Sequence, residues 1–233
     1  MRFASLGSGS AGNALVVQAD DTCLMLDCGF SIKETLARLA RLQLEPSQIN
    51  GIVITHEHDD HAGGAFKFAA KFNIPVWLSY GTLKMVDRYM PNQHSLDLHV
   101  VDSHRAFAIQ GIEVQPYPVP HDAREPLQLR CTDGDRHLGV VTDLGHASAH
   151  VVHALKNCHA LLLEANHDLE LLEASAYPTF LKKRVAGPRG HLSNNAAADL
   201  LAQIQHSALN HVLAAHLSER NNTPDLARAS LSQ

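Results

Sequence analysis

The stretch Thr55-His56-Glu57-His58-Asp59-Asp60-His61 follows the apolar run 51–54 and decides both the fold and the chemistry of this chain. Three imidazoles and three carboxylates occupy six consecutive positions, a density that folding does not require at the end of a buried strand. The chain contains 17 histidines, so the clustering carries the signal. A tight loop here would supply part of the ligand set for each of two neighbouring cations. His56 and His58 would face one cation, and Asp60 and His61 the other. Imidazole and carboxylate are ligands that Zn, Mn and Fe accept.

The composition indicates an ordinary globular protein. The 233 residues suffice for one domain with a substantial core, and 45% are hydrophobic while 18% are charged. A net charge of −5 gives no global basic field for nucleic acid. The four cysteines form no CxxC pair, which favours a reducing compartment. Gly7-Ser8-Gly9-Ser10 interrupts any signal-peptide core and no apolar run reaches membrane-spanning length, so we expect a cytoplasmic protein without membrane contact.

Short strands alternate with helices along the chain, which predicts an α/β protein. Strands are expected at residues 2–6, 14–19, 22–27, 52–55, 75–78, 106–110, 112–119, 127–131, 137–142, 160–164 and 211–215. Helices are expected at 31–42, 65–72, 82–89 (ended by Pro91), 148–157, 168–174, 179–185, 193–205 and from about 224, with a sharp reversal at Gly63-Gly64. Without linkers or repeats, residues 1–233 are expected to form a single domain. Its two mixed sheets would stack face to face, with helices on both outer sides.

Three further metal-ligand types each follow an apolar run. His121 comes after the strand 112–119, Asp143 after 137–142, and His216 after 211–215. Each alone is more typical of a turn or capping residue. Because α/β proteins place their sites at strand ends, the recurrence of these residue types at three strand ends favours one shared site.

His56-x-His58-x-Asp60-His61, with a later His, Asp and His, resembles the metal-binding motif of the metallo-β-lactamase superfamily. That resemblance implies an αββα sandwich, in agreement with the strand and helix pattern. Further blocks are similar to one branch, the YycJ/WalJ-like proteins: residues 7–13, 26–29, 142–145, 164–168, 190–194 and 215–222. Members of that branch are described as metal-dependent nucleases with 5′-to-3′ exonuclease activity on DNA. The resemblance therefore implies a dinuclear metal-dependent phosphodiesterase with DNA as substrate.

The resemblance also implies a ligand set for two divalent ions, Zn or Mn with Fe also accepted. One ion would be held by His56, His58 and His121, and the other by Asp60, His61 and His216, with Asp143 bridging both. Two cations ~3.5–4 Å apart can share a hydroxide, lower its pKa and clamp the attacking and leaving oxygens of a phosphodiester. Asp60 is expected to orient that hydroxide as well, and Asp27 to brace the metal loop without touching metal.

Protonation of the leaving group requires another residue. His191, in Gly190-His191-Leu192-Ser193, resembles the histidine assigned as general acid in the related tRNA-processing ribonucleases, and Glu164 matches its carboxylate partner. Such a pair would raise the histidine pKa and keep a proton available near neutral pH. The alternative is a histidine that merely packs at a helix start. His167 lies in a similar loop, and the same two interpretations apply to it.

The chain has one basic cluster, directly before His191: Lys182, Lys183, Arg184 and Arg189. Such a run is typical of a solvated helix face, but here it could also grip a phosphate backbone beside the site. Asp59 stands where relatives more often carry a small or neutral residue. It either adds negative charge that favours Mn or Mg, or is simply exposed.

Other functions remain open on this scaffold. A hydrolase of small or cyclic phosphodiesters uses the same machinery, and a glyoxalase II-like thioester hydrolase shares residues 61–64 loosely. No glutathione-binding carboxyl-terminal region is recognisable, which argues against the latter. A flavodiiron-like protein would have Glu in place of His58. A binding module on a dead scaffold would have lost ligands, and all seven positions are intact. The β-CASP module and flexible arm of RNA-processing relatives are missing, which argues against tRNA processing.

Overall fold

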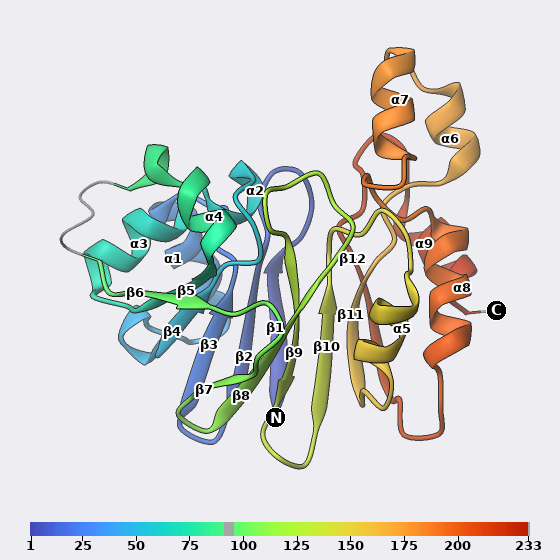
Figure 1. Cartoon of the computed structure of the whole chain (residues 1–233). Coiled ribbons are helices and arrows are strands. Elements are labelled where there is room, and N and C mark those ends of the chain that lie inside the picture. Colours follow the sequence, from blue (N-terminus) through green and yellow to red (C-terminus); the bar gives the residue numbers. More distant parts are fainter. Residues whose placement is uncertain (91–95, 233) are drawn as a thin grey trace. The chain divides into compact units, whose positions relative to one another are not determined.

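The computed structural model describes residues 1–90 and 96–232 (Figure 1). The chain divides into two compact units. Unit 1 comprises Met1–Pro116, Ala123–Leu127 and Thr132–Gly134, and unit 2 comprises Tyr117–Asp122, Gln128–Cys131 and Asp135–Gln233. Within the described part of the chain, no helix combines the length and apolar character needed to cross a membrane.

Unit 1 contains a mixed six-stranded sheet whose strands follow one another in sequence order. They are β1 (Arg2–Gly7), β2 (Ala14–Ala19), β3 (Thr22–Leu26), β4 (Gly51–Val53), β5 (Val76–Ser79) and β6 (Leu98–Val101). The pairs β1–β2 and β2–β3 are antiparallel, and the others are parallel. An antiparallel hairpin, β7 (Phe107–Ile109) with β8 (Ile112–Pro118), belongs to a second sheet. The helices are α1 (Ile32–Arg41), α2 (Asp59–Ala62), α3 (Ala65–Phe72) and α4 (Tyr80–Met85), with 3-10 turns at Pro46–Gln48 and Asp87–Tyr89.

The core of unit 1 lies between this sheet and helices α1 and α3. Met25 and Ile52 of the sheet pack in one cluster with Leu39 of α1 and with Phe66 and Phe68 of α3, all fully buried. Complete burial of such a side chain stabilises the fold by about 1.5–3 kcal/mol. The end of β4, where the histidine cluster begins, is therefore held on a rigid support.

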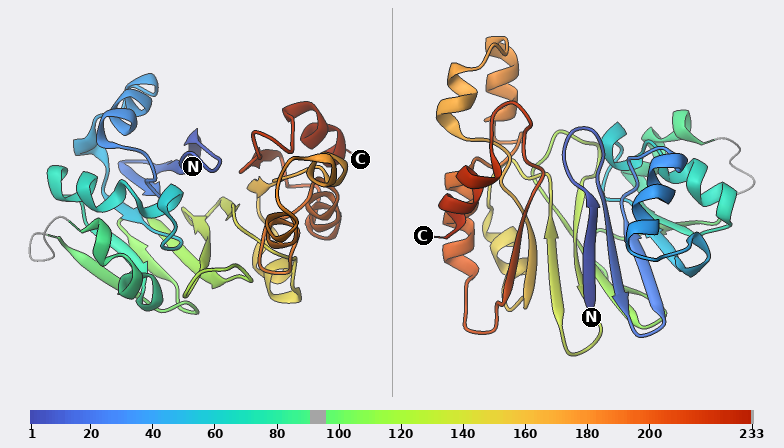
Figure 2. Two further views of the ribbon diagram at one scale, coloured as in Figure 1. Left: turned by 90° about the horizontal axis from the view of Figure 1, so that it is seen from above. Right: turned by 180° about the vertical axis from the view of Figure 1, so that it is seen from behind.

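Unit 2 contains most of β9 (Leu127–Thr132) and all of β10 (His137–Val141), β11 (Ala160–Glu164) and β12 (His211–Ala215), in that order in the second sheet. The last three strands are parallel, so their carboxyl ends meet at one edge. Helices α5 (Ala149–Leu155), α8 (Asn194–Ile204) and α9 (Pro224–Leu231) contribute buried side chains to a core with Val141, Leu161 and Leu163 of the sheet (Figure 2). Two more helices, α6 (Leu169–Ala174) and α7 (Thr179–Val185), follow β11.

The structure confirms most predicted elements, and 14–19, 65–72, 160–164, 179–185 and 211–215 match residue for residue. Three predictions were wrong in detail. The strand expected at 52–55 ends at Val53, and the expected tight loop is in part the short helix α2. The helix expected at 82–89 is α4 followed by a 3-10 turn, and Pro91 lies outside the described residues. The strand β6 was not predicted.

Gly63 and Gly64 act through close approach and not through an unusual backbone angle. Their φ values of −58° and −100° are open to any residue. A Cβ on Gly64 would lie 1.8 Å from the carbonyl oxygen of Phe30, and one on Gly63 would lie 2.4 Å from that of Asp59. The missing side chains let the start of α3 pack directly against the segment after β3.

Candidate functional site

In unit 1, the end of β4 leads directly into two histidines whose ring nitrogens converge. His56 Nε2 lies 3.0 Å from His58 Nδ1. Two nitrogens bound at ~2.0–2.1 Å to one tetrahedral ion would lie ~3.3 Å apart, so this pair has nearly the spacing of two ligands of one ion. His56 is fully buried, which fixes its ring.

Asp27 holds the rings of two histidines, His61 directly and His56 through Thr55. Its carboxylate accepts hydrogen bonds from the Thr55 backbone N–H and hydroxyl, both 2.8 Å, and from His61 Nδ1 at 2.7 Å. Because the Thr55 hydroxyl donates to Asp27, it accepts from His56 Nδ1, 3.0 Å away. Both histidines thus carry a proton on Nδ1 and a lone pair on Nε2, the form that binds metal. These contacts match the bracing role expected of Asp27.

Asp60 and His61 lie on the short helix α2, where Asn13 holds them. The Asn13 side-chain amide lies 3.0 Å from Asp60 Oδ2 and 3.0 Å from His61 Nε2. A Cβ on Gly29 would lie 1.9 Å from the Asp60 carbonyl oxygen, so only glycine permits this packing. We did not assign Asn13 from the sequence, although it ends the glycine- and serine-rich segment 7–13.

We expect Asp27→Asn to lower metal affinity about 10- to 100-fold while leaving the fold intact, as is typical when the partner of a ligating histidine is changed. Asp27 has a φ of 59°, which Asn tolerates, so the substitution changes the charge and one acceptor but not the backbone. Competition with a chromogenic chelator measures the affinity. Asp21→Asn, on the exposed turn between β2 and β3, is the matched control. Equal affinity in both variants would refute the role of Asp27.

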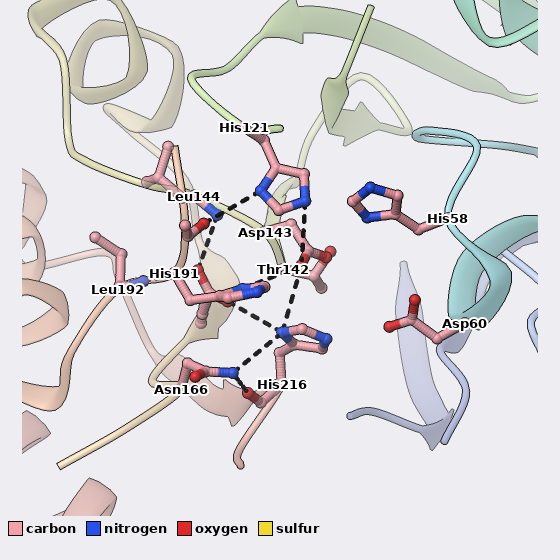
Figure 3. A network of polar contacts seen from close by, with 12 residues as sticks. His58, Asp60, His121, Thr142, Asp143, Leu144, Asn166, His191, Leu192 and His216 are labelled. Carbon is pink, nitrogen blue, oxygen red and sulfur yellow. Dashed lines mark hydrogen bonds and ion pairs between the residues drawn. The ribbon is translucent and has the colours of Figure 1, made fainter. Parts of the chain in front are cut away.

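In unit 2, four predicted residues come together at the carboxyl edge of the parallel strands (Figure 3). Asp143, Glu164, His191 and His216 each offer a ligand atom, and these atoms all lie within 4.8 Å of one another. His121 joins them from the end of β8, with Nε2 3.8 Å from Asp143 Oδ1. Its Nδ1 donates to the Gly190 carbonyl at 3.1 Å, which again leaves the lone pair on Nε2.

Glu164 is the centre of this cluster and is completely buried. One oxygen, Oε1, accepts hydrogen bonds from His191 Nδ1 at 2.8 Å and His216 Nδ1 at 3.0 Å. The other, Oε2, accepts from the backbone N–H groups of Leu144 at 2.8 Å and Leu192 at 3.1 Å. Four donors on one buried carboxylate stabilise its ionised form.

The electrostatics of the Glu164–His191 pair favour a proton on the imidazole. Burial opposes the charge on Glu164, but the attraction of His191 and the hydrogen bonds from His191 and His216 lower the pKa of Glu164 overall. Burial likewise opposes the charge on His191, but Glu164 and Asp143 raise the pKa of His191 to about 11. The His191 side chain is 23% exposed, against 4% or less for its neighbours in the cluster. It is thus the protonated and accessible member.

His216 has an unusual backbone conformation for a residue with a side chain. Its φ of 54° lies in the left-handed region, which non-glycine residues adopt uncommonly and at a cost. The Asn166 side-chain amide donates to the His216 carbonyl at 2.8 Å and fixes this geometry. Asn166 was missed at the sequence level, although it stands in the block 164–168.

The structure shows the environment of His167 and Asp59, two residues whose roles the sequence leaves undecided. His167 is buried, and burial lowers the pKa of this imidazole to about 4, so it is neutral near pH 7. Asp59 has a side chain 82% exposed; it accepts from the Tyr89 hydroxyl and pairs with Arg88 at 3.3 Å. The carboxylate of Asp59 is therefore engaged on the surface of unit 1.

Comparisons with known proteins place the whole chain in one family. A family model described as the metallo-β-lactamase superfamily matches residues 7–175. The chain is 34% identical over 233 residues to the exodeoxyribonuclease YycJ of Bacillus anthracis, covering 100% of this chain and 88% of the relative. It is 29% identical over 232 residues to the exodeoxyribonuclease WalJ of Streptococcus pneumoniae, covering 99% and 86%.

Solved structures show the same fold at lower identity. The metallo-β-lactamase fold protein YhfI from Bacillus subtilis aligns with a TM-score of 0.75 at 17% identity, covering 99% of this chain and 90% of that one. The short form of human tRNase Z aligns with a TM-score of 0.69 at 18% identity, covering 94% of each. At these identities the likeness concerns the fold alone.

Proposed function

Because this chain belongs to the YycJ/WalJ-like branch of the metallo-β-lactamase superfamily, we propose that it is a dinuclear metal-dependent phosphodiesterase, a DNA exonuclease acting 5′ to 3′. The predicted family and the α/β fold class, the αββα metallo-β-lactamase sandwich, are confirmed. The chain is a metal-dependent hydrolase, as its named relatives are exodeoxyribonucleases of the same superfamily. The identity of the metals, the polarity of cleavage and the residue roles belong to the proposal.

We assign seven residues to two divalent ions, Zn or Mn, with Fe also accepted. One ion is assigned to His56, His58 and His121, the other to Asp60, His61 and His216, and Asp143 is assigned to both. The donor chemistry fits, because His56, His61, His121 and His216 each have Nδ1 held by a partner and Nε2 ready to ligate. When bound, the ions would lower the pKa of an attacking water and offset phosphate charge.

The residues of the chain supply orientation and the proton. The Asp60 carboxylate accepts a hydrogen bond from the attacking water and orients it. His191, held at Nδ1 by Glu164, donates from Nε2 to the leaving oxygen. After cleavage, the imidazole regains a proton from solvent, to which it is partly exposed.

The buried Glu164 carboxylate beneath the accessible His191 is the observation that carries this proposal. An alkoxide is a poor leaving group and requires a proton, whereas a thiol has a pKa of about 8.5 and leaves readily as a thiolate. A histidine that is kept protonated by a buried carboxylate therefore favours phosphodiester cleavage over thioester hydrolysis.

We expect the purified protein with Mn or Zn to cleave 5′-labelled duplex DNA and a small phosphodiester, but not a glutathione thioester. Release of mononucleotides from the 5′ end, followed on denaturing gels, tests the polarity. Thioester turnover without phosphodiester cleavage would refute the proposal. Cleavage of the small phosphodiester alone would favour a small-molecule phosphodiesterase.

We further propose a cytoplasmic location and one domain over residues 1–233. The four cysteines Cys23, Cys28, Cys131 and Cys158 are free and buried, which suits a reducing compartment. The family-model match to residues 7–175 includes parts of both units and supports the single domain.

A further inference from the structure

The hairpin formed by α6 and α7 lies between the two residues of the general-acid pair in sequence. It follows the strand that ends at Glu164 and precedes His191. Figures 1 and 2 show the two helices side by side beyond the end of the unit 2 strands, away from α8 and α9. Both ends of the hairpin are fixed, because Asn166 N–H donates to the Leu192 carbonyl and Asn194 N–H to the His167 carbonyl, each at 2.9 Å. No residue of α7 is buried.

The last turn of α7 and the loop after it carry unneutralised positive charge. Lys182, Lys183 and Arg184 lie in that turn, and Arg189 follows in the loop. Arg184 pairs with Asp122 at 2.7 Å, and Lys182 donates to the Glu173 carbonyl of α6. Lys183 and Arg189 are exposed and form no ion pair with any residue in 1–90 or 96–232. Because α6 carries Glu170 and Glu173, the basic surface is limited to α7 and the loop that follows it.

Phe180 stands on the same helix and is 73% exposed, more than any other large hydrophobic side chain in the described part of the chain. Residues three and four apart share a helix face, so its ring lies beside Lys183 and Arg184. Leu169 and Leu171 of the neighbouring helix α6 are less exposed, at 49% and 38%. The exposed aromatic ring beside cations matches the stacking platform and phosphate contacts that bind single-stranded nucleic acid.

The same loop brings this surface to the site. His191 N–H donates to the carbonyl of Val185, the last residue of α7, at 2.8 Å. A Cβ on Gly190 would lie 2.2 Å from the carbonyl oxygen of Arg184, and one on Gly145 would lie 2.2 Å from that of Pro188. Backbone packed this tightly holds the end of α7 against the segment that bears His191.

We infer that α7 and the loop 186–190, here called the α7 platform, bind the DNA strand that enters the site. Phe180 stacks on a base, and Lys183 and Arg189 contact phosphates. This inference rests on the proposed function and adds to it the surface that selects a polynucleotide over a small phosphodiester. The bound part of the strand is a single-stranded end, including the frayed end of a duplex, because a base stacked inside a duplex does not expose its face.

The test uses the full-length metal-loaded protein and measures KM and kcat on a 5′-labelled single-stranded oligonucleotide at several salt concentrations. Phe180→Ala is expected to raise KM roughly 5- to 100-fold, the effect of losing one base–aromatic stack. Phe180→Tyr is expected to restore KM, and Phe180→Leu is not. The double variant Lys183→Gln/Arg189→Gln is expected to reduce the slope of log KM against log salt by about 1.4. The control Lys156→Gln/Arg228→Gln removes the same charge from elsewhere in unit 2.

The outcomes separate this inference from the proposed function. A wild-type protein that cleaves the small phosphodiester but no DNA refutes the exonuclease proposal. A wild type that cleaves DNA, with Phe180→Ala and the double variant matching the control in KM and salt slope, overturns the α7 platform. Wild-type KM in Phe180→Leu overturns the stacking role of the ring.

Discussion

Asp143→Asn is expected to abolish phosphodiester hydrolysis, with a loss of more than about 10³-fold in kcat/KM, because without the ions the pKa of the attacking water rises back toward its value in bulk water. Asp143 is buried, and its Oδ1 lies 3.3 Å from His191 Nδ1 and 3.5 Å from His216 Nδ1. A neutral amide of the same shape cannot offset the charge of two ions. Initial rates on the small phosphodiester and metal content by mass spectrometry measure the two effects.

The matched control for this prediction is Asp199→Asn on the exposed face of α8 in the same unit. It is expected to bind two ions per chain and to cleave the substrate at the wild-type rate. Thermal unfolding followed by circular dichroism distinguishes loss of metal from loss of fold. An Asp143→Asn protein that retains both ions and wild-type activity would remove Asp143 from the ligand set.

His191→Ala is expected to lower kcat about 10²- to 10⁴-fold on DNA while metal content stays at the wild-type level, the usual range for a lost general acid. The loss is expected to shrink on a substrate with a nitrophenolate leaving group, which departs without a proton. Comparison of the two substrates in wild type and variant measures this difference. Equal losses on both substrates would assign His191 a structural role.

Glu164→Gln tests the same acid through its pH dependence. Glu164 and Asp143 together raise the pKa of His191 to about 11, so in the wild type the imidazolium persists well above neutral pH. Without the Glu164 charge, the opposing effect of burial is less fully offset and the pKa of His191 falls, so its proton is lost at a lower pH. We expect the alkaline limb of the kcat profile to move to lower pH. An alkaline limb at the same pH as in the wild type would show that Glu164 does not act on the proton-donating step.

The convergence of the assigned ligands could be predicted because strand ends constrain their positions. In a parallel sheet the carboxyl ends meet at one edge, so Asp143, Glu164 and His216 after three neighbouring strands had to lie close together. The roles of Thr55, Asn13 and Asn166 could not be predicted. Hydroxyl and amide side chains are common in loops, and only the folded structure shows which ones face a histidine ring.

The fold errors have equally local causes. The helix α2 has four residues, too few to show a helical period, and its sequence Asp-Asp-His-Ala has no apolar face. The strand β6 shows a burial pattern with only Val101 buried, so its sequence does not alternate clearly. Short elements that depend on their neighbours leave little periodic signal.

The fixed ends of the α6–α7 hairpin make it an exchangeable cassette. The chain enters it after His167 and leaves it before Ser193, and these two residues form a parallel bridge that closes its base. All seven assigned metal ligands lie outside the segment between them, whereas the assigned general acid His191 lies inside it, two residues before its end. Hairpins of different length or charge that retain His191 could therefore be exchanged at this base, by evolution or by design, to redirect one hydrolytic centre from one class of polymer to another.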